Sequence, residues 1–210
     1  AVQPCSSVLV ANARALRLPV NLFALDMTPA VDLTQLHVTG AFRRQRPFYV
    51  DLLPPCKSAC PAGEDIQKWL GLAQAGKFKA AWEALISDNP MPAVHGRVCY
   101  HPCETSCNRK DLDSSVSIHA VERFLGDQAS VQGWKIPSGA PSTGKRVLVV
   151  GAGPSGLSAA YQLARLGHRV EIHDAGPLPG GMLHFGIPAY RLPRQDLMKE
   201  IARIEQMGVK

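Results

Sequence analysis

A glycine-rich turn between a short apolar strand and a helix constrains the fold of this chain more than any other feature. The stretch KRVLVVGAGPSGLSAAYQLARLGHRVEIHDAG indicates a β-branched strand, a turn, a helix that ends at Gly167 and a second strand that ends at an acid. Gly151, Gly153 and Gly156 give the spacing G-x-G-x-x-G directly after the strand at residues 146–150. The sequence therefore predicts a βαβ unit.

Each glycine of this turn has its own mechanical role in binding a dinucleotide. The first permits the tight turn, the second lets the backbone approach a pyrophosphate, and the third lets the helix pack close to the strand. Free amides at the helix N-terminus can receive the phosphate charge. The alternative is a glycine turn without a ligand. The expected phosphate-binding residues are Gly151, Ala152, Gly153, Pro154, Ser155 and Gly156.

The second strand predicts a ribose-binding carboxylate. Alternation along residues 169–174 places Val170 and Ile172 on the buried face and Asp174 at the carboxyl end. Asp174 lies about 20 residues after the first glycine, where a carboxylate accepts hydrogen bonds from ribose hydroxyls and repels a 2′-phosphate. We include its neighbour Ala175 in the expected site, and a surface aspartate is the alternative.

The cysteines form a second pattern, which favours metal binding. The chain has six cysteines and no recognisable secretory signal, which argues against a disulfide framework. Thiolates suit iron–sulfur clusters, and a proline after a cluster cysteine, as in Cys60-Pro61, is common. Four thiolates could bind zinc instead, although zinc sites favour shorter C-x2-C spacings. His95 and His101 could also be ligands or could be ordinary imidazoles. The cysteines outside the first residues are Cys56, Cys60, Cys99, Cys103 and Cys107.

Helical periodicity and breaks in the pattern predict four regions. Residues 1–53 form an extended arm, and residues 54–129 form a helical domain that carries the cysteines. Residues 130–145 are rich in Gly, Pro, Ser and Thr and form a linker, and residues 146–210 begin a Rossmann-like α/β domain. The fold class is therefore an α-helical domain followed by a βαβ unit that is incomplete at its C-terminus.

Composition narrows the possible partners. The formal net charge is +6, but basic residues are scattered, and the densest cluster, Arg43, Arg44 and Arg46, is short. We therefore expect no nucleic-acid partner, and no stretch is apolar enough to span a membrane. The surplus charge better suits anionic cofactor phosphates or an acidic partner. A cytoplasmic location agrees with thiols that stay reduced.

The dinucleotide region resembles the FAD-binding half of the glutamate synthase small-subunit family. The resemblance lies in the sequences GAGPSGLSAA, HDAG at the end of the second strand, and PLPGGMLHFGIP after it. The resemblance continues upstream through CKSACPAGEDI, NPMPAVHGRVC, HPCETSC and VSIHAVERF, and is shared with the N-terminal part of dihydropyrimidine dehydrogenase. It implies an iron–sulfur flavoprotein oxidoreductase with FAD in the glycine-rich site. By this resemblance, four further residues should line the FAD: Gly180, Gly181, Met182 and Leu183.

The resemblance also implies the cluster ligands. Two-cluster relatives have an additional C-x2-C pair before the C-x3-C-P motif, whereas residues 42–55 of this chain contain no cysteine. One [4Fe-4S] cluster is therefore expected in preference to two. Aligning VSIHAVERF with the family's ligand helix makes Glu122 a ligand beside Cys60, Cys99 and Cys103, although Cys56 or Cys107 could serve instead.

The implied function is electron transfer within a larger NAD(P)H-linked oxidoreductase. Electrons would pass between FAD and the cluster, to or from a redox partner protein or a larger catalytic subunit in a hetero-oligomeric complex. The family's nicotinamide site is expected beyond residue 210. The alternative is a non-catalytic assembly subunit with a structural metal site and a vestigial dinucleotide fold.

Overall fold

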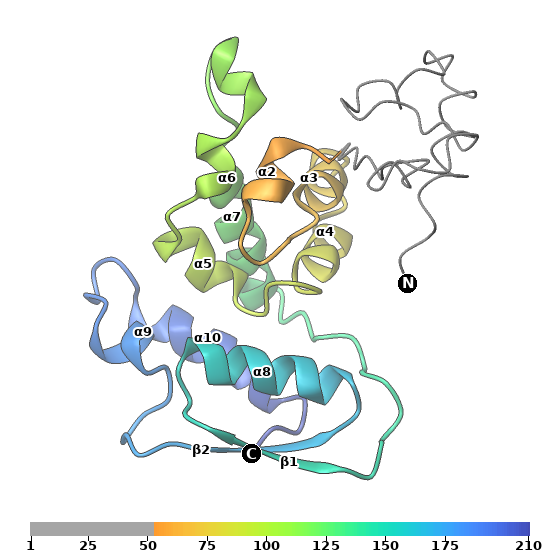
Figure 1. The fold of residues 1–210 in the computed structure, drawn as a ribbon, viewed down its shortest axis with the longest axis vertical. Helices are drawn as coiled ribbons and strands as arrows, with labels where there is room; N and C mark the ends of the chain where they lie inside the picture. The colour runs from red at the N-terminus through yellow and green to blue at the C-terminus, as the bar shows by residue number, and fades with distance from the viewer. Residues whose placement is uncertain (1–52) are drawn as a thin grey trace, which may run out of the picture. The chain divides into compact units, whose positions relative to one another are not determined.

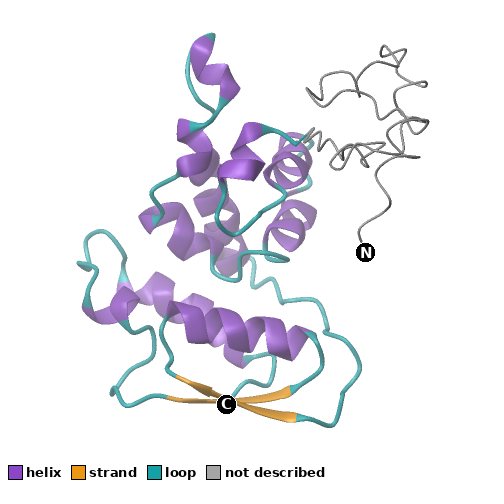
Figure 2. Cartoon of the chain, in the orientation of Figure 1, coloured by secondary structure: helices purple, strands orange, loops and turns teal. Residues whose placement is uncertain are grey.

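The computed structural model describes residues 53–210, which form one compact unit. The expected N-terminal arm and Cys5 lie outside these residues. Helices make up most of the unit, and the strands are confined to its second half (Figure 2). None of the described helices is long and apolar enough to cross a membrane.

The first half is built only of helices and loops in its described part, as predicted. A buried core formed by Trp69, Trp82, Leu85 and Leu125 holds the three longest helices of this half together, because each of these helices has one apolar face. The elements are α2 (Pro55–Ala59), α3 (Ile66–Gln74), α4 (Phe78–Leu85), α5 (Pro92–Val98), α6 (Pro102–Thr105), the 3-10 helix η2 (Asn108–Asp111) and α7 (Ile118–Val131).

Helices α5 and α7 approach closely because each carries a glycine at the contact. A Cβ atom on Gly96 would overlap the backbone of Arg123, and one on Gly126 would overlap the backbone of Ala93. The missing side chains let the two helix backbones touch. This contact positions the segment after α5, where Cys99 lies.

The second half begins with the predicted βαβ unit. Strand β1 (Arg146–Val150) and strand β2 (Arg169–His173) pair in parallel, with Val147 opposite Val170. Helix α8 (Pro154–Arg165) connects them and packs on one face of the sheet (Figure 1). The strand bounds match the sequence prediction to within one residue.

Helix α9 (Met182–Phe185) and helix α10 (Arg194–Glu205) follow, and the chain then returns to the sheet. Lys210 donates its N–H to Val170 O at 3.1 Å, and Ile172 donates to Lys210 O at 2.6 Å. This is the pattern of a parallel ladder. A further strand therefore starts to form beside β2, on the side away from β1.

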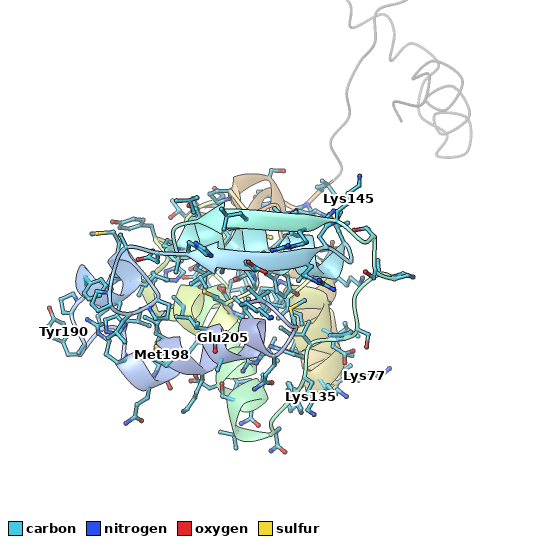
Figure 3. All side chains as sticks on the ribbon, turned by 90° about the horizontal axis from the view of Figure 1, so that it is seen from below. Lys77, Lys135, Lys145, Tyr190, Met198 and Glu205 are labelled. Carbon is cyan, nitrogen blue, oxygen red and sulfur yellow. The ribbon has the colours of Figure 1, made fainter. Side chains whose placement is uncertain are left out.

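One face of the sheet is covered by helices and the other is open. Figure 3 shows β1 and β2 in front of the helices, starting near the labelled Lys145, with no described element over them. Leu148 and Val150 of β1 accordingly expose 57% and 84% of their surface. This open face contrasts with the covered face, where Val170 is buried.

The two halves share packing as well as a linker. Met91 and Val94, from the helical half, belong to the same apolar core as Leu157 of α8 and Ile201 of α10. The boundaries predicted at residues 129 and 145 stay predictions. The shared core nevertheless means that the halves support each other within the compact unit.

Candidate cofactor sites

The glycine-rich turn has the geometry of a phosphate-binding loop. Gly151 has a φ of +99°, which favours glycine, and a Cβ atom on Gly156 would overlap the carbonyl oxygen of Gly151. A Cβ atom on Gly153 would instead meet nothing within 4 Å. The first-turn amides of Ser155 and Gly156 have no preceding helical turn to bond. The loop therefore offers open space beside free N–H donors, which fits a pyrophosphate.

Asp174 lies at the end of β2, next to this loop, as predicted. Its Oδ2 accepts the N–H of Ala152 and its Oδ1 accepts the N–H of Gly176, both at 2.6 Å. These backbone hydrogen bonds lower the pKa of Asp174, so the carboxylate is ionised. It can then accept hydrogen bonds from sugar hydroxyls at the edge of a pocket that also includes Ile172 and Pro177.

The double glycine packs directly on the phosphate loop. Gly180 donates its N–H to Ala152 O at 2.8 Å, and a Cβ atom on Gly181 would come within 2.9 Å of Gly153 Cα. Leu183 is buried in the core and Met182 is 70% exposed. Gly180 and Gly181 thus border the loop, whereas Leu183 contributes to the packing that supports it.

Five cysteines meet where α2 packs against α6, and all five have free thiols. Cys56 belongs to α2 and Cys60 follows it, while Cys99, Cys103 and Cys107 lie just before, within and after α6. The Cys103 thiol interacts electrostatically with Cys60 and Cys99. Cys56 interacts with Cys107 and Cys60. Packing therefore joins the two cysteine segments, which are far apart in the sequence.

The surroundings of these thiols change their pKa values in different directions. Burial raises the pKa of Cys103 to about 12, and it also raises the pKa values of Cys56 and Cys60. The pKa of Cys107 is lowered, mainly by a hydrogen bond from the backbone of Val116. A buried thiol such as Cys103 becomes a thiolate when a metal replaces its proton. The donor set therefore fits an iron–sulfur cluster.

Glu122 lies on α7 in a buried polar network. Its Oε1 accepts a 2.6 Å hydrogen bond from Asn89 Nδ2, which also donates to Glu64 Oε1 at 2.9 Å. Asn89 Oδ1 accepts the N–H of Met91 and lies 2.6 Å from His95 Nδ1. Burial, and then the charge of Glu64, raise the pKa of Glu122. Iron binding through Oε1 would replace the hydrogen bond from Asn89.

The sequence did not predict this network, nor a second set of buried polar contacts, which we call the polar joint. Asn89 and Glu64 carried a signal only as parts of the family-like strings NPMPAVHGRVC and CKSACPAGEDI. The joint holds α10 against the helical half, since Glu200 accepts the N–H of Ala93 at 3.1 Å and pairs with Arg203 at 2.6 Å. Its residues have no local sequence pattern, because they are defined only by packing.

Comparison with protein families agrees with the two-part organisation. Residues 51–134 match the family described as dihydropyrimidine dehydrogenase domain II, 4Fe-4S cluster. Residues 149–187 match the family described as an NAD(P)-binding Rossmann-like domain, which includes the glycine loop and Asp174. The 4Fe-4S domain thus contains all five cysteines described above.

Several known proteins are similar to most of this chain. The chain is 38% identical to the NADP(+)-dependent formate dehydrogenase subunit beta of Moorella thermoacetica and 38% identical to the glutamate synthase [NADPH] small chain of Escherichia coli. It is 39% identical to the NAD-dependent dihydropyrimidine dehydrogenase subunit PreT of Escherichia coli. Each match covers 74% of this chain, but the chain spans only 25%, 34% and 38% of these relatives, respectively. The resemblance to the glutamate synthase small chain and to dihydropyrimidine dehydrogenase is confirmed.

Proposed function

We propose that this chain is the electron-transfer part of an NAD(P)H-linked iron–sulfur flavoprotein oxidoreductase. It would bind FAD at the glycine loop and a [4Fe-4S] cluster at the cysteines, and pass electrons between them and a partner protein or second active site. The supporting observation is that the 4Fe-4S domain and the dinucleotide loop lie in one compact unit with a shared core. The chain spans 34% of the glutamate synthase [NADPH] small chain, so the activity of a whole protein of that kind is part of this proposal.

The dinucleotide part would hold FAD through its backbone. Amides of the turn and of the first residues of α8 would bind the pyrophosphate, and Asp174 would accept hydrogen bonds from the ribose. Gly180 and Gly181 would support this site by packing against the loop, since a Cβ atom on Gly181 would come within 2.9 Å of Gly153 Cα. The bound flavin supplies the exchange between two-electron hydride chemistry and single electrons.

The cysteine part would hold one cluster through Cys60, Cys99 and Cys103. The interaction of Cys103 with the other two supports this grouping. The fourth ligand would be Glu122, which requires release from Asn89, or else Cys56 or Cys107. Cys103 is buried, and this burial would influence the reduction potential of the cluster by limiting the access of water.

Anaerobic purification of the full-length protein tests the proposal. We expect extracted cofactor to be FAD and iron to be present at about four atoms per chain, the content of one [4Fe-4S] cluster. Cys103→Ser should lose iron and keep flavin, whereas Gly153→Val should lose flavin and keep iron. A protein with neither flavin nor iron would instead be an assembly subunit. Released NAD without flavin would contradict the FAD assignment.

A separate comparison identifies the fourth ligand. Glu122→Gln and Cys107→Ser are matched changes that remove one candidate donor charge each. If Glu122 is the ligand, Glu122→Gln should shift the reduction potential of the cluster, because it replaces a negatively charged carboxylate donor with a neutral amide. Loss of iron in Cys107→Ser alone, with an unchanged potential in Glu122→Gln, would assign the fourth position to cysteine.

A further inference from the structure

Three side chains beside the cysteines form a cluster that the proposed function does not use. His101 precedes α6, Glu104 lies within α6, and His119 lies in the first turn of α7. One ligand atom from each residue lies within 4.8 Å of the others, and all three residues are half-buried. Two segments of chain therefore bring two imidazoles and a carboxylate to one place.

Glu104 already organises one side of this cluster. Its Oε1 accepts the backbone N–H of His119 at 2.9 Å and lies 2.7 Å from Nδ1 of the same residue. An ionised carboxylate has no proton to donate, so Nδ1 of His119 is the donor in this pair. A metal ion can replace that shared proton, because a deprotonated Nδ1 and a carboxylate oxygen are both good ligands.

His101 completes the cluster and has two unusual features. Its Nε2 is buried and has no hydrogen-bond partner among the described residues, which is a costly arrangement that calls for a bound water or ion. Its backbone has a φ of 55°, which makes it the single non-glycine residue of the described chain in the left-handed region. This conformation places its ring 4.2 Å from the ring of His119. Strain of this kind is retained where the surroundings require a particular side-chain position.

We propose that His101, Glu104 and His119 form a binding site for a divalent transition-metal ion such as Zn²⁺, separate from the iron–sulfur ligands. Two histidines and one glutamate are an established ligand set for zinc sites that keep a position open for water. Zinc holds nitrogen donors at about 2.1 Å, so two donors on one ion lie at most about 4.2 Å apart. Small side-chain rotations bring the three donors onto one ion. The ion would tie α6 to the start of α7, beside Cys103.

Zinc titration of the cluster-loaded full-length protein tests the site, with zinc and iron both counted after dialysis. The cluster must be in place because empty thiolates also bind zinc. We expect about one zinc per chain with no loss of iron. His101→Asn, Glu104→Gln and His119→Gln should each weaken zinc binding at least about tenfold, and asparagine tolerates the left-handed backbone at position 101. His168→Ala is the matched control, since His168 is a histidine that contacts Thr143 instead.

The outcomes separate this site from the cluster and from the proposed electron transfer. The site is supported if wild type and His168→Ala retain zinc while the three variants lose it, with the iron content unchanged in all of them. This conclusion holds even if the protein contains no flavin. The proposal is overturned if cluster-loaded wild type retains no zinc, if zinc uptake equals iron loss, or if the three variants bind zinc as wild type does.

Discussion

The helical cysteine region and the dinucleotide region assemble their functional groups in different ways. In the dinucleotide region the loop, Asp174 and the double glycine are set mainly by backbone geometry within one βαβ unit and its continuation. In the cysteine region the candidate ligands come from α2 and from the segment around α6, which meet only through tertiary packing. We therefore expect substitutions to separate binding from stability in the first region and to couple them in the second.

Gly153→Val gives the largest expected effect on binding. The new Cβ atom would enter open space at a φ of −75°, so the free energy of unfolding should change by less than about 1 kcal/mol. The same side chain would block the approach of a pyrophosphate, so retained dinucleotide should be lost. Cofactor extraction and urea denaturation of the same sample measure both quantities. Retention of the cofactor would show that this backbone is not the phosphate site.

Gly126→Ala is the corresponding change in the helical region, where we expect stability and binding to fall together. Its Cβ atom would overlap the backbone of Ala93, so α5 and α7 must move apart. Overpacking of this kind should lower the free energy of unfolding by about 3 kcal/mol. Because α5 leads directly to Cys99, the iron content should also fall. A variant of unchanged stability with full iron content would contradict the coupling.

Glu200 tests the joint between the two regions through pH. Its complete burial raises its pKa to about 7, against the opposing charge of Arg203. The folded state therefore holds the proton more tightly than the unfolded state, whose value is near 4.5. The contribution of Glu200 to the free energy of unfolding is therefore complete below pH 4.5, the unfolded-state pKa, and is lost as the pH rises through the folded-state pKa of about 7.

The measurement compares wild type with Glu200→Gln by urea denaturation at several pH values. Between pH 5 and pH 7, wild type should lose about 2 kcal/mol more of its free energy of unfolding than the glutamine variant. Glutamine can still accept the N–H of Ala93, so this hydrogen bond is kept. Equal pH slopes for the two proteins would show that Glu200 does not change its protonation on folding.

Gly71→Ala has the smallest expected effect and the opposite sign. Gly71 lies inside α3, has no positive φ, and a Cβ atom there would meet nothing within 4 Å. Alanine should therefore raise the free energy of unfolding by about 0.5–1 kcal/mol, because it restricts the unfolded chain and favours the helix. Thermal unfolding of Gly71→Ala and Gly126→Ala measures both effects. Opposite changes in stability would show that the packing around a glycine decides whether alanine stabilises or destabilises the protein.

Local pattern was sufficient for much of the fold. The bounds of β1, the position of Asp174 and the all-helical character of the cysteine region in its described part followed from periodicity and turn residues. These features depend on neighbours in the sequence, so the sequence carries their signal directly. The cysteine spacing likewise indicated the metal class, and the family match confirms a 4Fe-4S domain.

Only the tertiary structure decided which side chains meet. Leu183 was expected to line the FAD by resemblance, but it packs in the core, while Glu122 bonds Asn89 across the fold. The cluster of His101, Glu104 and His119 also depends on α6 meeting α7. Spacing along a chain specifies the face of one helix or strand and does not specify the neighbour that covers that face. Long-range burial and hydrogen bonding, which raise the pKa of Glu200 and join the two regions, therefore required the structure.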